Sequence, residues 1–214
     1  MIKLTKEQIY GESRMSREEK INMFEQLLQS TNRPGVDKLL DFIRKSDFYT
    51  APASSKYHSD YEGGLLDHTL LVYILADGYA NVMKAMDPGV DLTIKDDSII
   101  ISSLLHDFCK VYMYKPAQKW RKDASGQWES YAGYDIEDTF PIGHGEKSII
   151  MLQTLGLDIN PCEMLAIRYH MGFWGGETNK EVLSAQTNAM KMCPLVILLQ
   201  MADFSASMIF EEEK

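Results

Sequence analysis

The chain has 214 residues, of which 45% are hydrophobic, and this is enough apolar sequence for one ordinary packed domain. Its formal net charge of −9 argues against a protein whose main task is to grip a nucleic acid backbone, because such a task requires a basic surface. The sequence contains no apolar run of roughly 18 residues and no apolar signal core near its start, so we expect a cytoplasmic protein with no membrane span.

Two short amphipathic helices are expected in the N-terminal part, residues 1–50. Ser16 and Glu19 form the Ser-x-x-Glu pattern of a helix N-cap, and apolar residues follow at helical spacing until Asn32-Arg33-Pro34-Gly35 ends the helix. The apolar positions of residues 36–43 indicate a second helix. Beyond it we expect a metal-binding core over 57–205, within a single domain that spans 1–214.

Two further helices carry ionisable residues in apolar surroundings. The apolar spacing of residues 65–75 predicts a helix that contains His68. Residues 99–105 are nearly all apolar, which predicts a buried helix, and this helix ends at the pair His106–Asp107.

A β-hairpin is expected at about 111–134, where the sequence is rich in aromatic residues. Its strands would be 111–122 and 127–134, joined by the turn Asp123-Ala124-Ser125-Gly126. Helical patterns return after Gly143, around 163–170, and from 194 to about 210. The fold class is therefore all-α: a helical bundle with a small β-hairpin insertion. The acidic tail Glu211–Glu212–Glu213 is expected to be a solvated helix end.

The three cysteines are Cys109, Cys162 and Cys193. Their odd number and their apolar or helical surroundings predict no disulfide framework and a reducing cytosol. Cys109 comes two residues after Asp107 and could touch a site there, although a small buried thiol is also typical of an ordinary core residue.

Histidines and aspartates of the metal-binding kind recur along these helices. The candidate ligands are His68, His106, Asp107, His144, His170 and Asp203. Imidazole and carboxylate suit divalent transition metals, and six ligands exceed what one tetrahedral site requires. A buried His–Asp pair needs a partner, because burying charge without one is costly. Each histidine taken alone is more typical of a satisfied or surface residue, and it is the joint pattern that indicates metal.

Five sequence elements together resemble the HD superfamily of metal-dependent phosphohydrolases. They cover about 57–205 and leave out the N-terminal helices. The His-Asp-x-x-Lys element is specific in combination with an upstream helical histidine and a late Ala-Asp, and the two intervening histidines resemble the subset of the family that holds two metals. The five elements are Gly63-Gly64-Leu65-Leu66-Asp67-His68-Thr69, Leu104-Leu105-His106-Asp107-Phe108-Cys109-Lys110, Gly143-His144-Gly145-Glu146-Lys147-Ser148, Arg168-Tyr169-His170-Met171-Gly172 and Met201-Ala202-Asp203.

The resemblance implies a mostly helical fold whose ligands surround a central cleft holding two divalent metals (Mn, Fe, Ni, Zn or Mg). The first metal would be held by His68, His106, Asp107 and Asp203, and the second by Asp107, His144 and His170, with Asp107 as the bridge. Two cations about 3.5–4 Å apart lower the pKa of a bridging water toward neutral and neutralise phosphate oxygens.

Lys110 and His58 join Asp107 as candidate catalytic residues. In the family the matching lysine contacts the substrate phosphate, which would place Lys110 in the cleft; alternatively, it is a lysine favoured by a helix C-terminus. His58 lies outside the proposed ligand set. It could protonate a leaving group or orient the substrate, or it could be an inert loop residue.

Three other residues are candidates for substrate binding together with Lys110. Tyr61 precedes the double glycine and could line the mouth of the cleft. Lys147 and Arg168 lie close in sequence to ligands and could add positive charge, although either could be an ordinary surface residue. Basic and aromatic residues of the hairpin could grip a nucleotide or a single-stranded nucleic acid, but such a mix is more typical of an exposed hairpin with one packed face.

The favoured function is an HD-type metal-dependent phosphohydrolase that cleaves a phosphomonoester or phosphodiester of a small nucleotide-like substrate. Binding of a nucleic acid is possible but not favoured in an acidic chain. Two alternatives stay open. One is a diiron oxygenase resembling myo-inositol oxygenase, which would contain iron and consume oxygen. The other is a nucleotide-sensing module, which would bind a nucleotide tightly without turnover.

Overall fold

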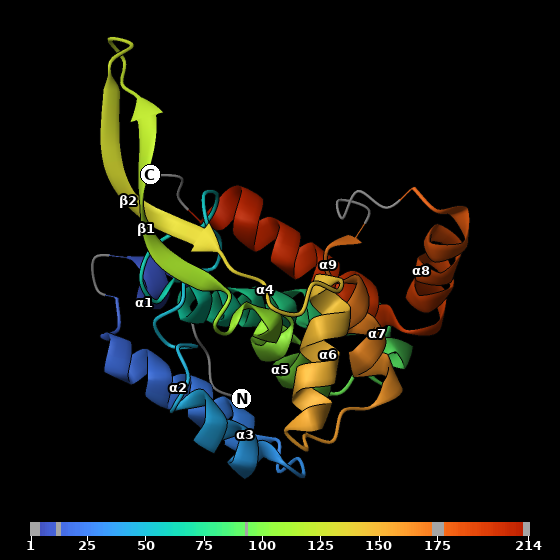
Figure 1. Cartoon of the computed structure of the whole chain (residues 1–214). Helices are drawn as coiled ribbons and strands as arrows, with labels where there is room; N and C mark the ends of the chain where they lie inside the picture. Colours follow the sequence, from blue (N-terminus) through green and yellow to red (C-terminus); the bar gives the residue numbers. More distant parts are fainter. Residues whose placement is uncertain (1–4, 12–13, 93, 173–177, 212–214) are drawn as a thin grey trace.

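The computed structural model describes residues 5–11, 14–92, 94–172 and 178–211. Helices dominate, and a single antiparallel pair of strands stands out from them within these residues (Figure 1). In chain order the elements are α1 (Lys6–Tyr10), α2 (Arg17–Ser30), α3 (Val36–Ile43), α4 (Gly64–Met86), the 3₁₀-helix η1 (Pro88–Leu92), α5 (Asp96–Leu105), the 3₁₀-helix η2 (Phe108–Lys110), β1 (Tyr114–Lys122), β2 (Trp128–Ile136), α6 (His144–Thr154), α7 (Pro161–Tyr169), α8 (Lys180–Met192), α9 (Pro194–Ser205) and the π-helix η4 (Ala206–Phe210).

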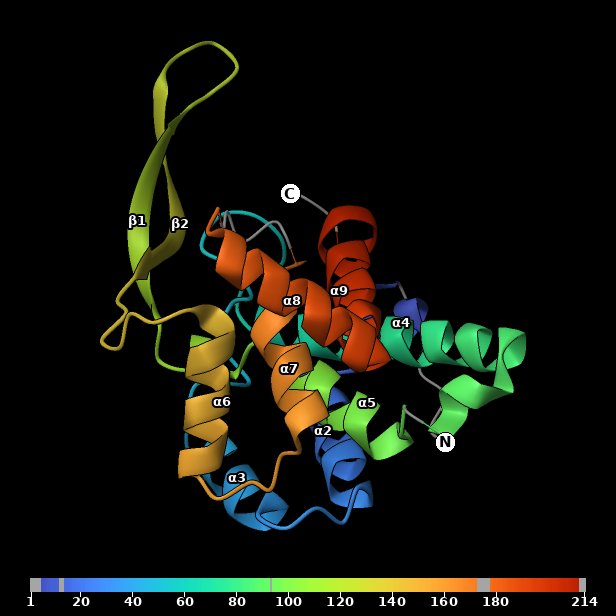
Figure 2. The same ribbon diagram turned by 90° about the vertical axis from the view of Figure 1, so that its right-hand side faces the viewer.

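Helix α4 is the centre of the fold. Its first half is buried on all sides, since every residue from Gly64 to Tyr73 is withdrawn from solvent. Helices α5 and α9 pack directly on it, and α2 lies on the side opposite α9 (Figures 1 and 2). Residues on this first half of α4 are therefore held by surrounding helices, and His68 is one of them.

The helices expected from apolar spacing are present. The predicted N-cap of α2 is formed: Ser16 Oγ accepts a hydrogen bond from the backbone N–H of Glu19, and the Glu19 side chain accepts one from the N–H of Ser16. Helix α7 begins with the same capping box, made by Asn160 and Glu163, and has Pro161 at its first position. The predicted final helix is α-helical only to Ser205, after which the chain makes the π-turn of η4.

The predicted hairpin is confirmed. Strand β1 begins three residues later than expected and ends at the expected residue, and β2 begins one residue later and ends two residues later. Tyr114 pairs with Ile136 at its base and Lys122 with Trp128 at its tip. Asp123 closes the turn by accepting hydrogen bonds from the backbone N–H groups of Ser125 and Gln127. Most residues of the hairpin are exposed, and the hairpin projects as an arm away from the helices in both views (Figures 1 and 2).

Two helices, α1 and α8, had no counterpart among the expected elements. Helix α8 begins at the N-cap Asn179 and buries only Gln186 and Ala189. Within the described part of the chain no single helix is long and apolar enough to cross a membrane. Helix α8 and the α9–η4 segment reach the required length and composition only together, and they are bent by 106° at their junction.

The expectation that the chain has no disulfide was wrong. Cys162, at the start of α7, and Cys193, between α8 and α9, form a disulfide whose Cα atoms lie 5.9 Å apart. Both residues sit at helix ends, so the periodicity of the sequence gives no sign that they meet. Cys109 is a free, buried thiol.

Candidate metal centre

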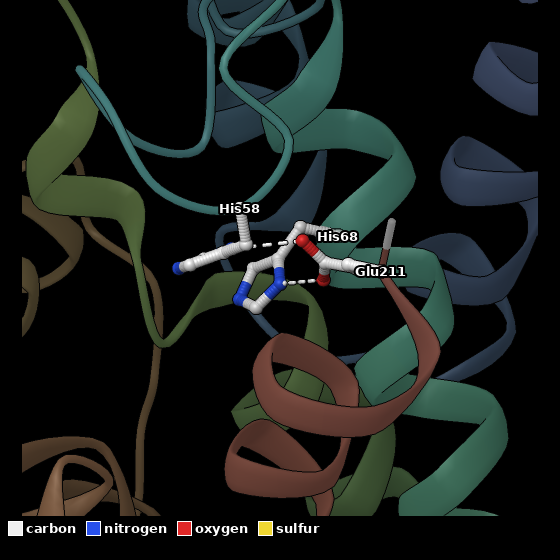
Figure 3. A group of neighbouring side chains, drawn as sticks. All are labelled: His58, His68 and Glu211. Atoms are coloured by element: carbon white, nitrogen blue, oxygen red, sulfur yellow. Dashed lines mark hydrogen bonds and ion pairs between the residues drawn. The ribbon is translucent and has the colours of Figure 1, made fainter. Parts of the chain in front are cut away.

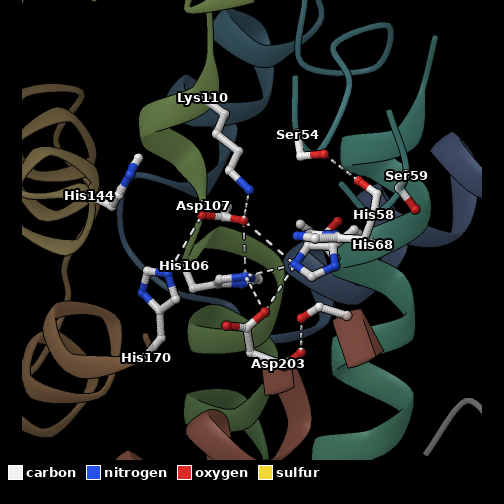
Figure 4. A network of polar contacts seen from close by, with 12 residues as sticks. Ser54, His58, Ser59, His68, His106, Asp107, Lys110, His144, His170 and Asp203 are labelled. Atoms are coloured by element: carbon white, nitrogen blue, oxygen red, sulfur yellow. Dashed lines mark hydrogen bonds and ion pairs between the residues drawn. The ribbon is translucent and has the colours of Figure 1, made fainter. Parts of the chain in front are cut away.

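Four helices bring five of the six predicted ligands together (Figure 4). His68 lies in the second turn of α4, and Asp203 lies in the last turn of α9. His106 caps the C-terminus of α5, Asp107 follows it, and His170 caps the C-terminus of α7. All five are buried, so no solvent-exposed surface explains their polarity.

The ligand atoms face one another across short distances. His68 Nε2 lies 3.2 Å from His106 Nε2 and 3.2 Å from Asp203 Oδ1. Asp107 uses its two carboxylate oxygens in different directions: Oδ2 lies 3.4 Å from His106 Nε2, whereas Oδ1 lies 3.6 Å from the Nε2 of His170. Both carboxylate oxygens of Asp107 thus face imidazole nitrogens of the cluster.

Three imidazoles turn the same nitrogen toward this cluster. The Nδ1 atoms of His106 and His170 lie 2.9 Å and 2.7 Å from the backbone carbonyls of Ser103 and Ile167, and the Nδ1 of His68 lies 2.5 Å from a Glu211 carboxylate oxygen. An acceptor at Nδ1 fixes the proton there and leaves the lone pair of Nε2 free for a metal. This common orientation indicates that the cluster is prepared to receive a cation.

His170 provides the test of whether a metal fits. Its Nε2 is buried and has no hydrogen-bond partner among the described residues, and a buried polar atom without a partner is costly. A cation would satisfy this nitrogen together with His106 and Asp203, whose ligand atoms lie close enough to share one ion. The described residues offer a second such group in His68, His106 and Asp107. The cluster could therefore hold metal ions.

Lys110 adds a buried positive charge beside the cluster. It ends η2, and its Nζ lies 2.5 Å from Asp107 Oδ2. Burial disfavours the charged ammonium, but the carboxylate of Asp107 outweighs this effect and raises the pKa of Lys110, which stays protonated. In turn, although burial would raise the pKa of Asp107, Lys110 and His106 hold it well below its usual value.

His144 is the predicted ligand that the structure does not bring into the cluster. It is exposed at the N-terminus of α6, and its Nδ1 lies 3.6 Å from the sulfur of Cys109 (Figure 4). The Cys109 thiol is buried, and burial followed by the charge of Asp107 raises its pKa to about 12. The expectation that Cys109 is a small core residue near the site fits this position.

The three other predicted substrate contacts do not line the pocket beside the His/Asp cluster. Lys147 is buried and pairs with Asp138 at 2.6 Å, and Arg168 pairs with Glu146 at 2.8 Å. The hydroxyl of Tyr61 donates to Asp67. These residues position structural elements in this conformation, and their contact with substrate stays a prediction.

A pocket of about 570 Å³ opens directly on the cluster. Its polar end is formed by His58, Asp107, Lys110, His170 and Asp203. Its remaining wall is mainly apolar, and half-buried or exposed side chains of one loop, the end of α7 and the face of α9–η4 supply it: Tyr57, Met171, Met201, Phe204 and Met208. The pocket thus joins a charged end to an apolar wall.

The double glycine Gly63–Gly64 at the start of α4 allows the loop that carries His58 to pack closely on this helix. Gly63 has a φ of 89°, which favours glycine. A Cβ on Gly64 would lie 2.0 Å from the backbone oxygen of Ser59, so only glycine allows the loop to pack on the start of α4. This close approach brings His58 to within 4.9 Å of His68, measured between ring centroids.

The expectation that the acidic tail is solvated was wrong for its first residue, Glu211. Glu211 is buried, and its carboxylate contacts His68 Nδ1 at 2.5 Å and His58 Nδ1 at 2.8 Å (Figure 3). The hydroxyl of Ser59 also donates to it. Glu212 and Glu213 lie outside the described residues. The one local sign of this role is the apolar helix before Glu211, and the partner residues are far away in sequence.

Comparison with known proteins finds a phosphodiesterase that is similar to part of the chain. A segment of 64 residues is 44% identical to dihydroneopterin 2′,3′-cyclic phosphate phosphodiesterase of Methanocaldococcus jannaschii, and it covers 30% of this chain and 24% of that relative. The chain therefore matches about a quarter of the relative's length. No family model matches the chain, and no solved structure is significantly similar to it. A phosphodiesterase homologue and a buried His/Asp cluster are together compatible with a metal-dependent phosphohydrolase.

Proposed function

We propose that the chain is an HD-type metal-dependent phosphohydrolase that acts on a phosphodiester or phosphomonoester of a small nucleotide-like substrate. The observation that carries this proposal is the buried cluster of His68, His106, Asp107, His170 and Asp203, which opens on a pocket beside the cationic Lys110. The partial similarity to a cyclic phosphate phosphodiesterase supports the same reaction class.

The composition of the pocket supports a substrate with one anionic and one apolar part. Lys110 provides a fixed positive charge at the polar end, and such a charge attracts a phosphate. Phe204 and the methionines of the opposite wall offer polarisable, adaptable surface, which suits a planar heterocycle. A nucleotide-like cyclic phosphate combines these two parts.

In the proposed reaction, His68, His106, Asp107, His170 and Asp203 would hold the divalent ions. Bound metals of this kind lower the pKa of a coordinated water and neutralise charge on a phosphate. Asp107 would ligate the metal ions through its carboxylate, and Lys110 orients the phosphate. His58, on the pocket wall beside the cluster, donates a proton to the leaving oxygen as the bond from phosphorus to that oxygen breaks.

A substrate screen on metal-loaded protein tests the proposal. We expect release of product from at least one of 2′,3′-cyclic nucleotides, 3′,5′-cyclic nucleotides, nucleoside monophosphates and dihydroneopterin cyclic phosphate, with Mn²⁺ and without oxygen. Activity that required iron and consumed oxygen would contradict the proposal and favour the oxygenase alternative. Tight nucleotide binding without product, across several metals, would favour a sensing module.

The variant Asp107→Asn tests whether metal binding and activity depend on the proposed site. The substitution keeps the shape of the side chain but removes the charge and the second metal-binding oxygen, so we expect loss of metal from the purified protein and a fall in kcat of at least about 100-fold. Asp158→Asn, which changes an exposed carboxylate between α6 and α7, is the matched control and keeps both. Full activity in Asp107→Asn would show that the site lies elsewhere.

A further inference from the structure

We propose that Glu211 is a positioning residue that holds both the metal ligand His68 and the candidate acid His58 in their working orientations. This inference rests on the proposed metal site, and it adds a residue that lies outside the expected ligand set. Glu211 lies in the segment after α9, far in sequence from His58 and His68. The inference therefore gives this segment a role in building the metal centre.

The contact with His68 determines which imidazole nitrogen faces the metal. Glu211 Oε1 lies 2.5 Å from His68 Nδ1, and both side chains are completely buried. Because a carboxylate can only accept here, the proton of a neutral His68 is placed on Nδ1, and Nε2 is turned toward His106 and Asp203. A carboxylate behind a metal-binding histidine also increases the basicity of the ligand.

The second carboxylate oxygen of Glu211 holds the loop. Oε2 accepts from the Ser59 hydroxyl at 2.7 Å and lies 2.8 Å from His58 Nδ1. The other ring nitrogen of His58 points away from Glu211 (Figure 3), and His58 lines the pocket. The carboxylate thus accepts the Nδ1 proton of His58, so that in the protonated ring it is Nε2 that presents its proton to a substrate oxygen.

The end of α9 is shaped to deliver this side chain. An uninterrupted α-helix would place residue 211 about 80° around the helix axis from Asp203, because each residue turns by about 100°. Instead, Ala206–Phe210 form a π-turn, and the N–H of Glu211 donates to the carbonyl of Ala206. The wider turn changes where residue 211 points, and π-turns of this kind are frequent at functional sites. Asp203 and Glu211 then reach the two nitrogens of His68 from one short segment.

Metal affinity is the readout that separates this role from a structural one. In Glu211→Gln the side chain keeps its size and one acceptor oxygen but loses the charge, so we expect Mn²⁺ and Zn²⁺ to bind about 10- to 100-fold more weakly. The measurement is titration of the metal-free protein with each ion alone, together with its thermal unfolding. If the affinity is unchanged, or falls only in step with unfolding of the metal-free protein, the proposal is wrong.

Two variants serve as controls. Ser59→Ala removes one bond to the same carboxylate without touching the contact with His68, and we expect its metal affinity to stay within about threefold of the unchanged protein. His58→Ala should also keep its metal affinity, since His58 lies on the other oxygen of Glu211. An equal loss of affinity in all three variants would indicate collapse of the loop and would overturn the specific role of Glu211.

Nuclear magnetic resonance of the Zn²⁺-loaded protein provides a second test should Glu211→Gln fold poorly. Selective ¹⁵N labelling of histidine should show a proton on Nδ1 of His68 that is strongly deshielded by the carboxylate. If the proton is on Nε2, or if the unchanged protein binds neither Mn²⁺ nor Zn²⁺, the proposal is wrong. Metal binding that depends on Glu211 without any hydrolysis would support this inference and contradict only the proposed function.

Discussion

At the scale of residues, the position of a side chain in the site depends on contacts with residues that are distant in sequence, and a local sequence pattern does not show these contacts. The five clustered ligands were predictable because histidine or aspartate in an apolar helix is unusual, and their joint pattern resembles a family. His144 has the same sequence signal, yet it lies exposed beside Cys109, because the helix that it begins presents it outward. For Glu211 the sequence offered only the apolar helix that precedes it, and its burial follows from a partner on α4.

Metal affinity should rise with pH because of the surroundings of His68. Burial lowers the pKa of His68, but the carboxylates of Glu211 and Asp203 outweigh this effect and raise it to about 10. The pKa values of Asp107 and Asp203 are lowered, and that of Asp203 lies at about 2, so both are already ionised at neutral pH. Burial lowers the pKa of His170, which is therefore neutral.

Binding of a metal at neutral pH must therefore displace about one proton, from His68. We expect the affinity for Mn²⁺ to increase about tenfold per pH unit between about pH 7 and pH 9. The slope of the logarithm of Kd against pH, and the dependence of the binding enthalpy on the ionisation enthalpy of the buffer, both measure the proton. An affinity that did not change across this range would contradict the assignment.

At the scale of elements, local sequence patterns predicted the helices that form the core, and the hairpin. Helices α2, α4 and α5 repeat apolar residues at helical spacing, and the hairpin combines aromatic residues with a turn sequence. Helix α8 was missed because it buries little and its residues are mostly polar. Periodicity also does not show which ends of helices lie next to one another. The disulfide between Cys162 and Cys193, which joins two such ends, was missed for this reason.

An ion pair joins three such elements through Arg33, in the loop between α2 and α3. Its guanidinium binds both oxygens of Glu163 at 2.8 Å and Asp97 at 2.6 Å, and the Glu163 side chain is completely buried. We expect Arg33→Met to lower the free energy of unfolding by about 3–5 kcal/mol, because it leaves a buried carboxylate without a counter-charge.

Chemical denaturation of Arg33→Met and of a double variant measures this effect. In Arg33→Met with Glu163→Gln the buried charge is absent and the amide can still bond Ser98 and Asn160, so the double variant should recover a large part of the loss. A loss below about 1 kcal/mol in the single variant would show that this ion pair does not secure α5 and α7.

At the scale of the whole molecule, the helices enclose the site and the hairpin arm stands outside them (Figure 1). That the fold is mostly helical with one hairpin could be predicted, because both signals are local. That α4, α5, α7 and α9 converge at His68, His106, His170 and Asp203 followed only from the resemblance. The convergence of these helices depends on long-range packing, which cannot be predicted from composition.

The disulfide should stabilise the α7–α9 half of the molecule. Its two cysteines are 31 residues apart, and closing such a loop contributes about 3–4 kcal/mol by restricting the unfolded chain. We expect the denatured, non-reduced protein to show one reactive thiol, Cys109, and the reduced protein to show three, with a lower Tm after reduction. Three reactive thiols before reduction would show that the bond is absent in solution.

The convergence of candidate ligands from four helices means that a bound cation would cross-link distant parts of the chain. His68, Asp107, His170 and Asp203 are separated by long stretches that are free to diffuse in the unfolded state, so such an ion would bind the folded chain and lose most of its ligands when the chain unfolds. A metal present at 100 times its Kd then adds about 2.7 kcal/mol to the unfolding free energy of the entire chain. A chelator would consequently expose remote helices to proteolysis, and resistance to digestion would report metal occupancy without any substrate.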